Sequence, residues 1–240
     1  IVEENKFMCK SLKEINAGSN FLNNWVYEQT KEIMDKGKLV GLLGGDHSTP
    51  FGYIKAIGER YPEFGILQID AHCDLRDTYE GFVYSHASIM FNALKEIDSI
   101  KKLVQVGIRD FCDEELEIIQ NSNGRIVTFF DKLIKERQYE GDTWKNIVDD
   151  IIAALPQHVY ISFDIDGLDP KLCPHTGTPV QGGFEAEQIF YLLRKIHLAG
   201  KKIIGFDLNE VGVSNNEWDE NVGARILYKL CSHIIASNPV

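Results

Sequence analysis

Three side chains of metal-binding type alternate along one short segment: Asp70, His72 and Asp74 stand at the end of an apolar run. In an extended backbone, alternate residues project to the same side, so these three side chains can converge on one point. The segment therefore predicts a metal ion at the end of a buried strand.

Two other apolar runs end in residues of the same kinds. His47 follows the run at 39–43 after a Gly-Gly-Asp turn, and Asp164 and Asp166 close another run. Open α/β sheets place their active sites at the carboxyl ends of strands. Any one of these residues alone could simply cap a helix or make a buried hydrogen bond.

Taken together, the residues form a set of four carboxylates and two imidazoles: His47, Asp70, His72, Asp74, Asp164 and Asp166. Carboxylates packed this closely repel one another, and the arrangement persists only if cations neutralise them. Two divalent ions would do so. Oxygen-rich ligands favour Mn²⁺ over zinc or copper, although Ni²⁺, Co²⁺ and Fe²⁺ tolerate similar ligands. Two such ions about 3.5–4 Å apart lower the pKa of a shared water toward neutrality, which indicates hydrolysis.

The composition limits the possible binding partners and the cellular compartment. The chain of 240 residues is long enough for one large domain with a substantial core. Its formal net charge of -11 disfavours nucleic acid and anionic membranes as partners and favours a cationic ligand. The five cysteines are scattered without C-x-x-C pairing, which indicates a reducing cytosol rather than a disulfide framework. We see no membrane-spanning run or signal peptide in the sequence, so we expect a cytoplasmic protein.

Apolar runs alternate with helical patterns along the chain. We expect strands at 39–43, 64–70, 102–108, 125–129, 158–164 and 202–207. We expect helices at about 20–36, 50–60, 86–96, 112–121, 143–154, 184–199 and 219–236, whereas 1–20 is polar and weakly patterned. This alternation predicts an α/β fold, with a mainly parallel sheet covered by helices on both faces in a single domain over 1–240.

Two segments between these elements are too long to be simple connections. They cover 75–85 and 167–183, directly after two of the candidate metal-binding segments. Long loops beside strand ends often form the walls of a substrate pocket, and we expect that role for both.

The metal-binding segments read Gly44-Gly45-Asp46-His47-Ser48, Asp70-Ala71-His72-Cys73-Asp74 and Ser162-Phe163-Asp164-Ile165-Asp166-Gly167-Leu168-Asp169-Pro170. Their order and spacing, with Thr176–Gly183 beyond them, resemble the signature segments of the ureohydrolase family of arginases, agmatinases and formiminoglutamases. The resemblance implies a three-layer α/β/α sandwich, two Mn²⁺ ions per chain and a homo-oligomer, commonly a trimer or hexamer.

The resemblance also implies how the ligands are divided between the two ions. One ion would be held by His47, Asp70, Asp74 and Asp164, and the other by His72, Asp70, Asp164 and Asp166. In this arrangement Asp70 and Asp164 bridge the two ions.

The same resemblance implies roles for further residues. Glu210 matches the acid that pairs with the substrate guanidinium, His86 matches a histidine that delivers a proton to the leaving nitrogen, and Asp74 would orient the attacking hydroxide. The reaction would cleave a C–N bond of a linear amidine and release urea and an amine. Asp207 lies on the other side of its strand from Glu210 and is expected to be structural. A capping role for Glu210 and a helix-start role for His86 are the plain alternatives.

Substrate identity is less tightly defined. The retained His86 favours an agmatinase-type substrate, a small cationic guanidino compound. Arg76 resembles an arginine of formiminoglutamases, where a basic side chain suits an acidic substrate, but it could equally pair with a nearby carboxylate. His175, in the second loop, is a further candidate for the pocket wall. A formiminoglutamase, or a guanidine or guanidino-acid hydrolase of the same family, is therefore the alternative.

Two rivals lie outside this interpretation. A deacetylase of similar architecture would use a single zinc, whereas His47 and Asp74 supply ligands for a second ion. A catalytically silent, metal-binding partner subunit belongs to another class and would bind ions without turnover. One departure concerns residues 1–37, which do not match the strand and Gly- and Pro-rich loop with which family members usually begin. The domain over 1–240 would then lack that N-terminal element.

Overall fold

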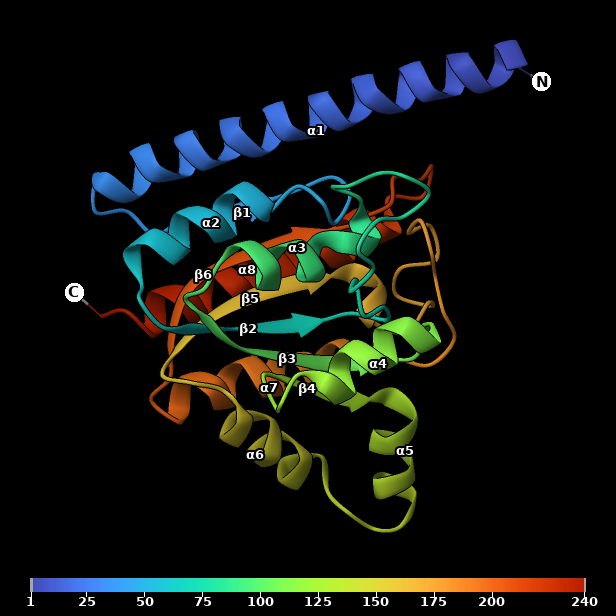
Figure 1. The fold of residues 1–240 in the computed structure, drawn as a ribbon. Coiled ribbons are helices and arrows are strands. Elements are labelled where there is room, and N and C mark those ends of the chain that lie inside the picture. Colours follow the sequence, from blue (N-terminus) through green and yellow to red (C-terminus); the bar gives the residue numbers. More distant parts are fainter. Residues whose placement is uncertain (1, 240) are drawn as a thin grey trace.

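The computed structural model describes the backbone of residues 2–239 and the side chains of residues 9–239. Within this range, six parallel strands form one sheet in the order β1-β6-β5-β2-β3-β4 (Figure 1). Their bounds are β1 Gly41–Leu43, β2 Phe64–Ile69, β3 Ile100–Ile108, β4 Ile126–Phe130, β5 His158–Asp164 and β6 Lys202–Asn209.

The helices lie before, between and after these strands. The α-helices are α1 Val2–Asp35, α2 Phe51–Arg60, α3 Ile89–Glu96, α4 Asp113–Asn121, α5 Asp131–Tyr139, α6 Trp144–Ala154, α7 Ala186–Leu198 and α8 Trp218–Ala236, with 3-10 turns η1 His86–Ser88 and η2 Ile165–Gly167. Among the described residues, no helix combines the length and the apolar content that crossing a bilayer requires.

Helices cover both faces of the sheet, which confirms the expected three-layer α/β fold. On one face, α6, α7 and α8 bury side chains such as Ile151, Leu192 and Ile226 against alternate strand residues. On the other face, α2 and α3 pack against the remaining strand side chains, and α1 lies outside α2 (Figure 1). Burial on both faces explains why β2, β3, β5 and β6 are rich in Val, Ile, Leu and Phe.

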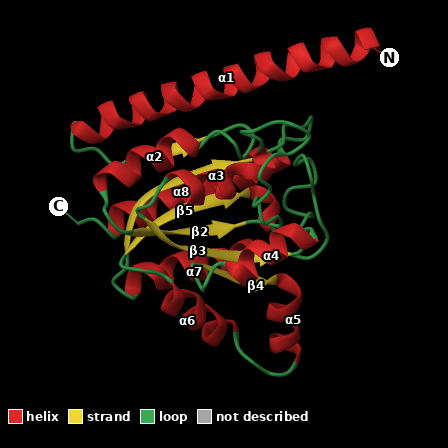
Figure 2. Ribbon diagram, viewed as in Figure 1, coloured by secondary structure: helices red, strands yellow, loops and turns green. Residues whose placement is uncertain are grey.

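The parallel direction of the strands brings all their carboxyl ends to one edge. Figure 2 shows the loops gathered on the side to which the strand arrows point. The candidate metal-binding segments therefore lie together at this edge, as expected for an open α/β sheet. That residues 1–240 constitute a single domain stays a prediction.

The structure corrects the sequence expectations at two helices. The first helix begins at Val2 rather than near residue 20, and at about 1.5 Å per residue it is about 50 Å long. Along 9–20 its side chains are mostly exposed, so no apolar stripe marked that half as helical. The second is α5, which was not expected because it buries only Asp131 and Ile134 and therefore lacks an amphipathic pattern.

Candidate metal and substrate site

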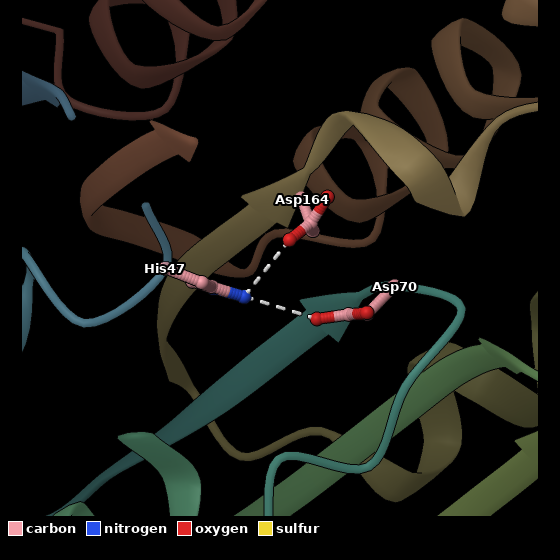
Figure 3. Close-up of side chains that lie close together, drawn as sticks. All are labelled: His47, Asp70 and Asp164. Atoms are coloured by element: carbon pink, nitrogen blue, oxygen red, sulfur yellow. Dashed lines mark ion pairs between the residues drawn. The ribbon is translucent and has the colours of Figure 1, made fainter. Parts of the chain in front are cut away.

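His47 stands at the centre of the first group of candidate ligands. Its Nδ1 lies 3.0 Å from Asp70 Oδ2 and 3.3 Å from Asp164 Oδ2 (Figure 3). The carboxylate of Asp74 approaches the same nitrogen to 3.0 Å. Gly44, in the turn before His47, allows this turn to pack closely against β6, because a Cβ there would lie 2.0 Å from Asn209 Oδ1.

His72 forms the second group with the two remaining carboxylates. Its Nδ1 lies 3.0 Å from Asp166 Oδ2 and 3.6 Å from Asp70 Oδ1. Asp70 therefore turns one oxygen toward His47 and the other toward His72. This is the geometry of a carboxylate shared between two adjacent cation positions.

The chemistry of these side chains fits metal ions. His47 Nδ1 is buried and has no hydrogen-bond partner. The groups around it are carboxylates, which only accept hydrogen bonds when ionised. His47, Asp70 and Asp164 form one set, and Asp70, His72 and Asp166 form another, each with ligand atoms within 4.8 Å of one another. A buried collection of this kind is stable when cations occupy it.

Crowding shifts the pKa values of the cluster in opposite directions. Burial and the charge of Asp70 raise the pKa of Asp74 to about 7, and burial raises the pKa of Asp164 well above its ordinary value. Burial opposes a charged imidazole, but the surrounding carboxylates raise the pKa of His72 to about 11 and also raise that of His47. Burial likewise opposes ionisation of Asp70, but the nearby imidazoles of His47 and His72 hold its pKa below the ordinary range. Without cations, the cluster therefore retains protons on groups such as His72 and Asp74.

Two residues of this edge adopt a left-handed backbone that their side chains ordinarily avoid. Asp74 has φ of +55° and Glu210 has φ of +60°. Such conformations cost about 1 kcal/mol or more and persist only where the surrounding structure imposes them. Both residues follow strands at the same edge, so the candidate site includes two positions with strained backbone.

Glu210 is anchored beside His47. Its Oε1 accepts a hydrogen bond from the backbone N–H of His47 at 2.9 Å, and its own N–H donates to Gly45 O at 2.9 Å. Thr176 Oγ1 donates to its carbonyl oxygen. Burial raises the pKa of the carboxyl group. These contacts fix the carboxylate of Glu210 beside His47.

A cavity of about 150 Å³ opens beside the cluster. Residues that line it include His72, Asp74, Arg76, Tyr79, His86 and Glu115. The rings of Tyr79 and His86 meet edge to face with centroids 5.7 Å apart, and the Arg76 guanidinium lies over the Tyr79 ring. Thus the first long loop forms part of the wall, together with the predicted residues Arg76 and His86.

His175 occupies a different environment. Its Nδ1 lies 2.8 Å from Asp219 Oδ1, and its backbone N–H donates to the other oxygen of the same carboxylate. This pairing connects the second long loop to the first turn of α8. His175 thus contacts the first turn of α8 through Asp219. Its expected part in substrate binding stays a prediction.

Sequence reasoning missed Glu115 and the buried glutamine Gln68. Glu115 is buried in the first turn of α4 and accepts from the backbone N–H of Leu75, next to Asp74. Gln68 interrupts the apolar residues of β2 and donates to Asp70 Oδ2 at 2.8 Å. A polar residue inside a buried strand is a signal that the sequence offers, whereas the partner of Glu115 becomes apparent only in the fold.

A parallel α/β sheet with carboxylates and imidazoles clustered at its carboxyl edge defines a protein built to hold metal ions. The chain belongs to the arginase family, whose model matches residues 7–234.

Individual relatives carry names of related activities. The chain is 36% identical over 203 residues to an N(1)-aminopropylagmatine ureohydrolase of Thermus thermophilus, covering 85% of this chain and 65% of that protein. It is 30% identical over 207 residues to the agmatinase of Bacillus subtilis, covering 85% of this chain and 67% of that protein. The chain thus spans about two thirds of the length of these relatives.

A solved structure shares the fold. The agmatine ureohydrolase of Thermoplasma volcanium superimposes with a TM-score of 0.72 at 26% identity, covering 91% of this chain and 69% of that one. This agrees with the sheet and the two helical layers described above.

Proposed function

We propose that the chain is a ureohydrolase that cleaves the C–N bond of a small cationic guanidino compound and releases urea and an amine, as an agmatinase does. The observation that carries the proposal is Asp70, whose two oxygens face two separate imidazoles. Membership of the arginase family and the names of the relatives support the same reaction class. They give no support to a catalytically silent partner subunit.

Two Mn²⁺ ions are the proposed cofactors, with Ni²⁺, Co²⁺ or Fe²⁺ as chemically similar substitutes. The proposed ligands of the first ion are His47, Asp70, Asp74 and Asp164, and those of the second are His72, Asp70, Asp164 and Asp166. When bound, the ions would neutralise the carboxylates and activate water for hydrolysis.

The chain's own side chains would then direct the reaction. Glu210, held beside His47, accepts hydrogen bonds from the planar guanidinium and offsets its charge. Asp74 orients the attacking water and accepts its proton. His86, on the cavity wall, donates a proton to the departing nitrogen as a general acid.

The cavity wall bears on the substrate class. Arg76 Nε lies 3.9 Å from Glu115 Oε2, so its charge is offset by a buried carboxylate. This pairing favours a substrate without an acidic tail, as expected for an agmatine-like compound. Arg76 is also the observation that favours the second candidate, a guanidino acid or formimino substrate whose carboxylate would displace Glu115 from the guanidinium. A cytoplasmic homo-oligomer, a trimer or hexamer, completes the proposal on the strength of the family resemblance.

The test is product release by protein loaded with Mn²⁺ or, separately, Ni²⁺. Urea is measured with agmatine, arginine, guanidinobutyrate and guanidine, and formamide with formiminoglutamate. Release from agmatine supports the first candidate, and release from guanidinobutyrate or formiminoglutamate supports the second. Asp70→Asn should abolish turnover, whereas the exposed control Asp77→Asn should not. Two bound ions without turnover of any compound would favour the silent-subunit alternative.

A further inference from the structure

A row of polar side chains crosses the sheet one layer beneath the candidate metal site. The Cα atoms of the row pair in register from strand to strand: Thr128 of β4, Gln105 of β3, Gln68 of β2, Ser162 of β5 and Asp207 of β6. All five side chains lie on the same face of the sheet, since paired residues of parallel strands point the same way.

The row separates the apolar core from the candidate ligands. On β2, Ile66 packs in the core formed with α2 and α3, Gln68 belongs to the row, and Asp70 belongs to the metal site. On β5 the corresponding order is Tyr160, Ser162 and Asp164. Gln68, Gln105, Ser162 and Asp207 are all 0% exposed. Buried polar groups destabilise a fold unless they are hydrogen-bonded, so a complete row of them in a core requires a reason.

One half of the row is a hydrogen-bond chain with a fixed direction. The ionised Asp70 carboxylate can only accept, so Gln68 must present its NH₂ group, and it does so at 2.8 Å. The Gln68 carbonyl oxygen then accepts from Gln105 Nε2 at 2.7 Å, and the Gln105 oxygen accepts from Thr128 Oγ1 at 2.8 Å. The ionised carboxylate of Asp70 therefore determines the orientation of every group in this hydrogen-bond chain.

The other half is a chain that ends on His47. The Asp207 carboxylate accepts from Ser162 Oγ at 3.1 Å. Because the hydroxyl proton of Ser162 is used there, Ser162 Oγ accepts from His47 Nε2, which lies 2.9 Å away. His47 therefore carries a proton on Nε2 and directs Nδ1 toward the carboxylates of Asp70 and Asp164.

We propose that the row consists of positioning residues, with Gln68 and Gln105 fixing the carboxylate of Asp70 and with Ser162 and Asp207 fixing the ring of His47. The inference rests on the proposed metal site. It adds that the ligands are oriented by two directed hydrogen-bond chains and not only by the strand ends that carry them. Groups that orient metal ligands in this way commonly change metal affinity about 10–100-fold when removed.

The first test compares Ser162→Thr with Ser162→Val. The two replacements have nearly the same shape, but only threonine retains a hydroxyl to accept from His47. Mn²⁺ affinity is measured on the full chain by titration calorimetry and by the EPR signal of unbound Mn²⁺. We expect the valine variant to bind about 10–100-fold more weakly than the threonine variant.

The second test addresses the other chain with Gln68→Met and Gln68→Glu. Methionine retains the approximate shape without a donor, and an ionised glutamate presents only acceptors to Asp70. Both should weaken Mn²⁺ binding, glutamate by the larger factor. The matched control is Ile66→Val, two residues earlier on the same face of β2, which should lower the melting temperature and leave Mn²⁺ affinity unchanged.

These measurements separate the possible failures. Equal affinity in the wild type and all Ser162 and Gln68 variants would overturn the positioning role while leaving the metal site intact. A fall in affinity that tracks melting temperature, with Ile66→Val behaving like the others, would also overturn it. If the wild type bound no divalent ion, both the metal site and this inference would be wrong. Metal binding without turnover would count against the proposed activity alone.

Discussion

At the scale of single residues, Asp74 combines two unfavourable features. It is in a left-handed conformation, and it shares one imidazole with the carboxylates of Asp70 and Asp164. Burial disfavours its charged form, and the neighbouring charge of Asp70 repels it, which is why the pKa of Asp74 rises to about 7. Its side chain therefore opposes folding of the metal-free protein increasingly as pH rises from about 4, where the unfolded chain ionises it, to about 7.

Asp74→Asn is accordingly expected to stabilise the metal-free protein. Asparagine tolerates the left-handed region and removes the repulsion, so the free energy of unfolding in EDTA at pH 8 should rise by on the order of 1 kcal/mol. The increment gained from Mn²⁺ should shrink in the same variant, since a ligand is lost. Urea denaturation with and without Mn²⁺ measures both quantities.

The control for this variant is Asp77→Asn, which makes the same replacement at an exposed residue of the first long loop. Asp77 belongs to neither ligand set, so its replacement should change the unfolding free energy by less than about 0.5 kcal/mol. A loss of metal-free stability in Asp74→Asn would contradict the repulsion argument.

At the scale of elements, α1 supports the loop that forms part of the cavity wall. The Asn16 side chain donates to Gly81 O at 3.0 Å and accepts from the Val83 N–H at 3.0 Å. Asn16→Ala should therefore accelerate hydrogen exchange at Val83 and raise KM several-fold, with little change in melting temperature. Asn20→Ala, an exposed change one turn further along the helix, is the control. Unchanged exchange at Val83 would show that α1 does not restrain the loop.

At the scale of the whole molecule, metal loading is coupled to protons. Without cations, His72 has a pKa raised to about 11 and Asp74 one raised to about 7, so both hold protons that divalent ions must displace. Apparent Mn²⁺ affinity should therefore increase as pH rises from about 6 to about 9, with net proton release on binding. Calorimetry in buffers of different ionisation enthalpy counts the protons. Binding without proton release at neutral pH would contradict these assignments.

The sequence predicts the positions of the strands and helices better than it predicts the contacts between them. Each of the six strands was expected near its observed position, and β2, β3, β5 and β6 were easiest to locate because strands buried on both faces are rich in apolar residues. The ligand segments were expected at one edge for the same reason. The first half of α1 and α5 were missed because they bury too few side chains to leave a periodic pattern.

Contacts that depend on strand order were beyond sequence reasoning. Gln68, Gln105 and Ser162 are far apart in the chain, and only the pairing of β3 with β2 and of β2 with β5 aligns them. The left-handed backbone of Asp74 and Glu210 is likewise imposed by surrounding structure, since neither residue type prefers it.

The strand order also determines when the site can exist. β6, the last strand in the described part of the chain, lies between β1 and β5, so His47 cannot meet Asp164 until that strand has been synthesised and inserted. A growing chain on the ribosome therefore cannot yet assemble the ligand group of His47, Asp70 and Asp164. An ion bound by this group would therefore stabilise the completed fold rather than nucleate folding. Mn²⁺ should slow unfolding in stopped-flow experiments and leave the refolding rate unchanged.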